Sequence, residues 1–154
     1  MLVGCSDNNP ANNHKQDLKS EAKEFALKIV QSYIENDSLA YKTYLPDTIY
    51  SLEPWEKPVP SDSVSLTAFF SSFDYSQYSM SDYYEVYDPV IMNYEEYAEV
   101  DPEWLDAFTY WHPDDQDYLF IGHQVKEGQT EFMVNDLLGF MVTQRTGVWQ
   151  LRAQ

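Results

Sequence analysis

The sequence has a single cysteine, Cys5, which excludes an internal disulfide bond. It also lacks any run of about 18 or more apolar residues, so no segment is long and apolar enough to be a membrane-spanning helix. The signatures of common catalytic and cofactor sites are missing too: there is no glycine-rich phosphate loop and no CxxC, HExxH or GxSxG motif. We therefore expect no cofactor or metal, and no motif identifies a catalytic residue.

Basic residues are scarce. The chain has 9 Lys and Arg against 26 Asp and Glu, a formal net charge of -17. The negative electrostatic field of such a chain repels phosphate backbones, which excludes nucleic-acid binding through a basic surface. Hydrophobic residues make up 44% and aromatic residues 16% of the chain, enough to build a core, and the length of 154 residues fits one domain.

The clearest secondary-structure pattern lies in the last third of the chain, from Tyr118 to Arg152. Residues 118–125 alternate with the period of two that is typical of a strand, which places Leu119, Ile121, His123 and Val125 on one face. Gly128 marks a turn, and further apolar runs follow over residues 130–144 and 148–151. This pattern predicts an antiparallel meander of three strands.

A polar break at Asn135 and Asp136 interrupts the second of these strands. We interpret it as a bulge or bend, because bulges let a strand curve. A curved sheet needs a helix to cover it, and we expect Trp149 to be buried between the two.

The helix with the strongest pattern covers residues 17–36, where apolar side chains recur at steps of three and four: Leu18, Ala22, Phe25, Ala26, Ile29, Val30 and Tyr33. A shorter helix over residues 39–44 is predicted to stop before Pro46. Residues 49–52 fit a short strand.

This order of a long amphipathic helix, a short helix and a terminal meander ending in Gly147, Val148 and Trp149 resembles the nuclear transport factor 2-like superfamily. The resemblance covers residues 17–52 and 118–152, about half of the chain. It implies an α+β cone in which the long N-terminal helix packs on a curved antiparallel sheet. The alternative is a helical N-terminal two-thirds followed by a three-stranded C-terminal meander.

Leu2 to Cys5 resembles the bacterial lipobox, in which the cysteine receives a diacylglyceryl group and becomes the mature N-terminus. Only Met1 precedes it, so we expect the true start to lie upstream. Residues 1–16 would then be a lipobox remnant with a flexible tether over 8–16, followed by a single domain over 17–154. The resemblance implies a protein anchored by lipid in the bacterial cell envelope. With Ser6 after the cysteine, the outer membrane, facing the periplasm, is favoured. The alternative is an ordinary free cysteine.

The middle of the chain is acidic and rich in tyrosine. Between Pro58 and Val125 there are fourteen Asp and Glu, nine of the thirteen tyrosines and no Lys or Arg. Residues 61–73 and 101–113 fit helices, the second with Asp101 and Pro102 as a start signal. Asp88 and Pro89 give the same signal, but residues 89–97 fit a strand equally well.

Three interpretations of this segment compete. It could bind a basic protein or a small cationic ligand, since aromatic faces and carboxylates both attract cations. Asp114, Asp115 and Asp117, with His112 nearby, could hold a divalent metal, although their spacing is not that of a calcium loop. The third interpretation is an acidic surface that only maintains solubility.

The sequence favours a binding or accessory protein over an enzyme. The candidate contact residues are Tyr94, Tyr97, Trp104, Trp111 and Tyr118. The alternative is a small-molecule-binding or enzymatic cone with an interior pocket, in which His123 is the candidate acid or base.

Overall fold

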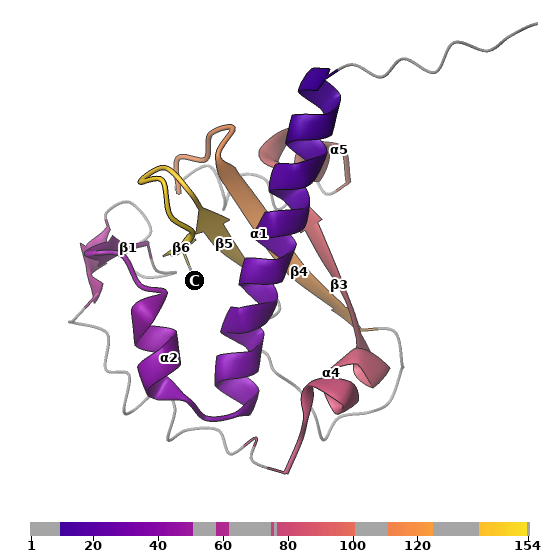
Figure 1. Cartoon of the computed structure of the whole chain (residues 1–154), viewed down its shortest axis with the longest axis vertical. Coiled ribbons are helices and arrows are strands. Elements are labelled where there is room, and N and C mark those ends of the chain that lie inside the picture. Colours follow the sequence, from indigo (N-terminus) through magenta and orange to yellow (C-terminus); the bar gives the residue numbers. More distant parts are fainter. Residues whose placement is uncertain are drawn as a thin grey trace, which may run out of the picture.

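The computed structural model describes residues 10–50, 58–61, 75, 77–100, 111–124 and 139–153, with residues 10–12, 59, 123 and 124 described by their backbone alone. The helices are α1 (Pro10–Ile34), α2 (Ser38–Thr43), α4 (Met80–Val86) and α5 (Tyr94–Val100). The strands are β1 (Thr48–Ile49), β2 (Val59–Pro60), β3 (Tyr87–Met92), β4 (Asp117–Gln124), β5 (Gly139–Thr143) and β6 (Gln150–Ala153). Figure 1 shows α1 crossing the sheet, with the other helices at its margins. The α+β class expected from the sequence is confirmed.

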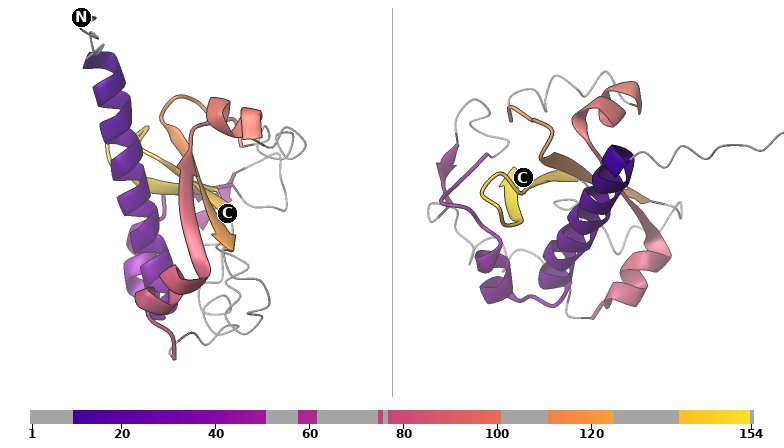
Figure 2. Two further views of the ribbon diagram at one scale, coloured as in Figure 1. Left: turned by 90° about the vertical axis from the view of Figure 1, so that its right-hand side faces the viewer. Right: turned by 45° about the horizontal axis from the view of Figure 1, so that its top comes forward.

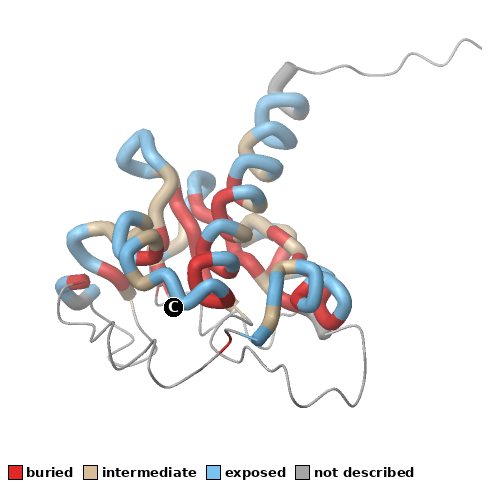
Figure 3. Tube along the Cα trace, turned by 60° about the horizontal axis from the view of Figure 1, so that its bottom comes forward, coloured by how far each residue is buried: buried red, intermediate tan, exposed pale blue. Residues whose placement is uncertain are grey.

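Helix α1 is longer than the sequence pattern predicts, because it begins at Pro10. The prediction of a flexible tether over residues 8–16 is therefore wrong from Pro10 onward. Proline is favoured in the first helical turn, and no glycine or second proline interrupts the residues that follow. Figure 3 shows that the turns near this end are exposed, while the later turns are buried on one side.

The buried stripe of α1 packs on the sheet. Ala22, Ala26, Ile29 and Val30 are fully buried, and the helix contacts β3, β4 and β5. Helix α1 ends where Asn36 adopts a positive φ of 54°, a conformation that asparagine tolerates better than most residues. Asp37 then caps α2, its carboxylate accepting a hydrogen bond of 2.9 Å from the Ala40 amide.

Strands β3, β4, β5 and β6 form one antiparallel sheet in that order. The meander of β4, β5 and β6 confirms the three-stranded prediction, and β3 adds a fourth strand at the edge. Gly147, with a φ of 84°, donates a 2.8 Å hydrogen bond to Gln144 that closes the turn between β5 and β6. The pairing of β5 with β6 shifts register between Met141 and Val142. The bulge predicted at Asn135 and Asp136, the Gly128 turn and the two helices predicted over residues 61–73 and 101–113 lie almost entirely outside the described residues.

Of the two alternatives left open at Asp88 and Pro89, the strand is the one found, because both residues lie in β3. Pro89 pairs with Gly122 of β4, and among the described residues β3 has a hydrogen-bonded neighbour on this side only. An edge strand tolerates proline, since the missing amide hydrogen is not needed there. Residues 89–97, for which strand and helix were both open, divide into the end of β3 and the start of α5.

The sheet buries apolar side chains on both faces. Along β4, Tyr118 and Phe120 belong to the core beneath α1, whereas Leu119 belongs to a smaller cluster with Tyr97 and Trp111. This alternation is the one predicted from the period-two pattern. The left view in Figure 2 shows α1 along one face of the sheet and α5 at the far end of β3.

A short hairpin of β1 and β2 lies beside the last strand. Tyr50 forms a parallel bridge with Ala153, and its amide donates a 3.0 Å hydrogen bond to the Arg152 carbonyl. The strand predicted over residues 49–52 overlaps β1 (Thr48–Ile49), and residues 51 and 52 lie outside the described residues. The hairpin is thus joined to β6, at the opposite edge of the main sheet from β3.

Candidate functional site

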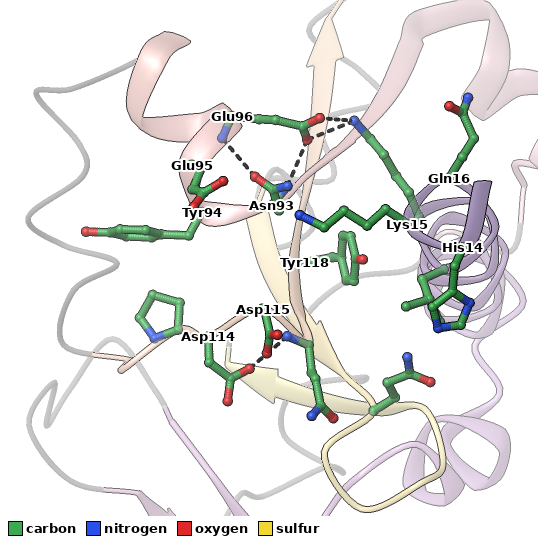
Figure 4. Close-up of a pocket in the computed structure, with 15 residues that line it drawn as sticks. His14, Lys15, Gln16, Asn93, Tyr94, Glu95, Glu96, Asp114, Asp115 and Tyr118 are labelled. Carbon is green, nitrogen blue, oxygen red and sulfur yellow. Dashed lines mark hydrogen bonds and ion pairs between the residues drawn. The ribbon is translucent and has the colours of Figure 1, made fainter. Parts of the chain in front are cut away.

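A cleft of about 890 Å³ opens beside the N-terminal turns of α1. Its opposite walls are the start of α5 and residues 113–116, the segment that leads into β4. Figure 4 shows side chains from these elements converging on the cleft. A cleft of this volume is within the range of small-ligand sites.

Tyr118 lies at the inner end of the cleft, where β4 begins. Only 4% of its surface is exposed, and its ring contacts that of Trp149 with centroids 6.0 Å apart. Burial raises the pKa of the Tyr118 hydroxyl, and the negative charges of Glu96 and Asp115 raise it further. The hydroxyl is therefore neutral at physiological pH. It has no hydrogen-bond partner in the described part of the chain.

Lys19 and Glu96 connect α1 to α5 across the cleft. The Lys19 ammonium donates hydrogen bonds of 2.7 and 2.8 Å to the two carboxylate oxygens of Glu96, 77 residues away. Glu96 also accepts a 3.0 Å hydrogen bond from the Asn93 amide, and its own amide donates to the Asn93 side chain at 2.8 Å. Partial burial raises the pKa of Glu96, but the hydrogen bonds from Lys19 and Asn93 and the Lys19 charge outweigh it, so the pKa lies below its ordinary value.

The segment that forms the other wall is held in place by Asp117. This carboxylate is fully buried and accepts hydrogen bonds from the Arg145 guanidinium, one of them 3.1 Å long from Nε. It also accepts a 2.9 Å hydrogen bond from the Asp114 amide, and the Arg152 Nε lies 3.5 Å away. A buried carboxylate needs such compensation, since an isolated charge in the interior is very costly.

The two arginines also bind the backbone just before this segment. Arg145 donates a 2.7 Å hydrogen bond to the His112 carbonyl, and Arg152 donates a 2.8 Å hydrogen bond to the Trp111 carbonyl. The Arg152 guanidinium lies over the ring of Tyr50, 5.0 Å from its centroid. Residues 111–117 are therefore held by charged groups to β6 and to the turn that precedes it, which gives the cleft one fixed wall.

Three charged side chains in the cleft form no ion pair in the described residues. They are Lys15 on α1, Glu95 on α5 and Asp115 in the segment before β4. All three are exposed. Their neighbours Lys19, Glu96 and Asp114 are already paired, since Asp114 lies 2.9 Å from the Arg145 Nε. The unpaired charges are therefore the ones available to a ligand.

The structure places the contact residues predicted from the sequence in different environments. Tyr94 and Tyr118 both line the cleft. Tyr97 and Trp111 belong to the smaller core cluster and do not line the cleft, so the structure does not support them as ligand contacts. These aromatic side chains pack in the core on the face of the sheet opposite α1. Composition alone does not distinguish an aromatic residue that packs in a core from one that binds a ligand.

Three other predicted site residues have no described side chain. Trp104 and Cys5 are not among the described residues, and His123 is known by its backbone alone, in β4 opposite Asp88. The sequence suggested Asp114, Asp115 and Asp117 as metal ligands. In the structure, Asp114 and Asp117 form ion pairs with Arg145, so only one of the three carboxylates is unpaired. Within the described residues, no group of three or more His, Cys, Asp or Glu side chains is arranged to hold a metal ion.

Sequence reasoning missed the basic residues of the site. Lys15 was assigned to a tether, and Arg145 and Arg152 received no role. A signal was present, because these are the only two arginines in a chain of net charge -17, and both lie in the final hairpin. In so acidic a chain, each arginine was a strong candidate to form an ion pair with a carboxylate.

Comparison with known proteins finds no matching family model, no similar curated protein and no similar solved structure. None of the helices in the described part of the chain combines the length and apolarity that a membrane span requires. The geometry of the cleft is therefore the basis for assigning a function.

Proposed function

We propose that this protein is a binding module whose cleft between α1 and residues 113–116 holds a cationic group, from either a small organic amine or a basic side chain of a partner protein. The observation that carries the proposal is Tyr118, a buried tyrosine whose unpaired hydroxyl lies in the cleft near the carboxylates of Glu96 and Asp115. Binding, and not catalysis, is the role that these groups support.

An ammonium group has three donors and needs acceptors in return. Asp115 and Glu95 offer unpaired carboxylates, and the neutral Tyr118 oxygen offers a further acceptor. Hydrogen bonds between an ammonium and a carboxylate are among the stronger ones in proteins. The net charge of -17 adds a long-range field that speeds the encounter with cations.

The direct test is calorimetric titration of the full chain with 1,5-diaminopentane, with the dicarboxylate glutarate as a probe of equal length and opposite charge. We expect the diamine to bind and glutarate not to bind. Tyr118→Phe and Asp115→Asn should each weaken diamine binding several-fold or more. The matched control is Glu24→Gln, because Glu24 is an exposed residue of α1 that does not line the cleft.

Salt dependence gives a second readout. Binding that rests on charge should weaken as ionic strength rises from low to physiological. Equal binding of diamine and glutarate, or diamine binding that is unchanged in both cleft variants, contradicts the proposal.

We further propose that the fold is a nuclear transport factor 2-like cone. The support is α1 across an antiparallel sheet, together with a short hairpin joined in parallel to β6. An experimental structure that describes residues 125–138 would decide this, since a cone requires them to continue the curved sheet.

Anchoring to the bacterial envelope through a lipid on Cys5 remains part of the proposal and rests on the lipobox resemblance. Expression with the native upstream sequence should give a membrane-associated protein that Cys5→Ala releases. If the unaltered protein is recovered in the soluble fraction, the anchor does not exist.

A further inference from the structure

We propose that the natural ligand of the cleft is a short peptide with free ends, whose terminal ammonium is bound by Asp115, Glu95 and Tyr118 and whose terminal carboxylate is bound by Lys15. This inference rests on the proposed function and specifies its ligand class. It starts from a feature that cation binding alone does not explain, namely an unpaired lysine in the same cleft.

Lys15 and Lys19 are one helical turn apart, so they share a face of α1. That face is directed into the cleft, because Lys19 reaches across it to Glu96. Figure 4 shows the Lys15 side chain extending in the same direction, toward Tyr118 and Asn93. Unlike Lys19, Lys15 forms no ion pair in the described residues, although the chain carries 26 acidic side chains. A free ammonium that points into a cleft is a binding group for an anion.

The unpaired charges of opposite sign lie on different walls. Lys15 belongs to α1, whereas Asp115 and Glu95 belong to the segment before β4 and to α5. A ligand with an ammonium at one end and a carboxylate at the other would satisfy both walls at once. A simple amine would leave Lys15 without an anion and bring a second cation close to it.

Two amide side chains also line the cleft. Gln116 and Gln144 both line it, and neither side chain has a hydrogen-bond partner in the described residues. A primary amide offers both donors and acceptors, which is the pairing that peptide groups require. The backbones of the two residues are fixed to each other, since the Gln144 amide donates a 3.4 Å hydrogen bond to the Gln116 carbonyl. The cleft therefore offers a ligand unpaired carboxylates, side-chain amides and an unpaired ammonium group.

The test compares three forms of one tripeptide, trialanine, by calorimetric titration of the full chain. The forms have free ends, an amidated C-terminus or an acetylated N-terminus. We expect the free form to bind most tightly and each blocked form to bind about tenfold more weakly or worse, because each loses a charge-assisted contact.

Lys15→Met identifies the group that binds the carboxylate. We expect this variant to bind free trialanine about tenfold more weakly and to bind the amidated form as the unaltered protein does. Lys28→Met is the matched control, since Lys28 is an exposed lysine of α1 outside the cleft and should leave all three affinities unchanged.

The outcomes separate this inference from the proposed function. If the amidated peptide binds at least as tightly as the free form, and acetylation abolishes binding, the ligand is a cation and the role of Lys15 is refuted. If no form of trialanine binds but 1,5-diaminopentane does, the peptide class is refuted and cation binding stands. If neither probe binds, both proposals fail.

Discussion

The carboxylate of Asp117 is fully buried against the guanidinium of Arg145, which lies 28 residues further along the chain. This pair joins the start of β4 to the turn between β5 and β6. The Arg152 guanidinium adds a second positive charge on the same side. Because the cluster also fixes the backbone of residues 111–117, it supports both the fold and one wall of the cleft.

Asp117→Ala should therefore lower the free energy of unfolding by about 3 kcal/mol, because it leaves the largely buried Arg152 guanidinium without a carboxylate, although Arg145 keeps Asp114. Urea denaturation of both proteins measures the change. Asp115→Ala is the control, since its exposed carboxylate should contribute less than about 0.5 kcal/mol. A loss as small as that of the control would mean that water, and not the interior, surrounds Asp117.

The Lys19–Glu96 pair predicts a pH dependence of stability. The pKa of Glu96 in the folded chain is lower than its ordinary value of 4.5, so the ionised form stabilises the fold. The contribution is fully present above about pH 4.5 and is lost as the pH falls through the lowered pKa. Both side chains are partly exposed, at 37% and 43%, which limits the effect to about 1 kcal/mol or less.

Glu96→Gln should accordingly be less stable than the unaltered protein at pH 7, and the difference should shrink toward pH 3. Unfolding by urea across this range tests it. Glu24→Gln, which removes an exposed carboxylate from α1, should give a small difference without this trend. A Glu96→Gln difference that grows on acidification has the wrong sign for this mechanism.

Trp149 tests how firmly α1 is held to the final hairpin. The side chain is half-buried, its ring lies 6.2 Å from that of Phe25, and its indole N–H donates a 3.4 Å hydrogen bond to Glu21. The sequence predicted a fully buried tryptophan, whose loss would cost about 3–5 kcal/mol. At half burial we expect Trp149→Ala to cost about 2 kcal/mol. Thermal unfolding measures the change, with Val148→Ala, a substitution at an exposed neighbour, as the control. Equal losses of stability in the two variants would show that Trp149 does not join the helix to the sheet.

Tyr83 carries a buried hydroxyl with no hydrogen-bond partner in the described residues. Its ring stacks on Tyr87 with centroids 5.0 Å apart, so the ring is well packed although the hydroxyl is not satisfied. Tyr83→Phe should raise the free energy of unfolding by about 1 kcal/mol, because it removes an uncompensated polar group and keeps the ring.

Tyr41→Phe is the opposite case. The Tyr41 hydroxyl is buried but hydrogen-bonded to Tyr33, so its removal should destabilise the protein by about 1 kcal/mol. Denaturant unfolding of the two variants should therefore give changes of opposite sign. Destabilisation by both would indicate that the Tyr83 hydroxyl has a partner after all.

The sequence by itself determined the elements whose pattern is local. The apolar stripe of α1 and the alternation along β4 are periodic, and each period belongs to one type of structure, so both were predicted with their faces. The overall α+β class follows from those two patterns. Pro89 shows where a local signal fails: proline after aspartate favours a helix start, but an edge strand accepts it equally well, and only the neighbouring strand decides.

Only the tertiary structure decided which residues form the cleft. Lys19 and Glu96 are 77 residues apart, and Asp117 and Arg145 are 28 apart, so no local pattern links them. The same is true of the aromatic rings: Tyr94, Tyr97 and Tyr118 are alike as sequence, yet Tyr97 fills the smaller core cluster, whereas Tyr94 and Tyr118 line the cleft. Chain topology sets which charges meet and which aromatic rings border the cleft, because those relationships arise only when distant segments pack together.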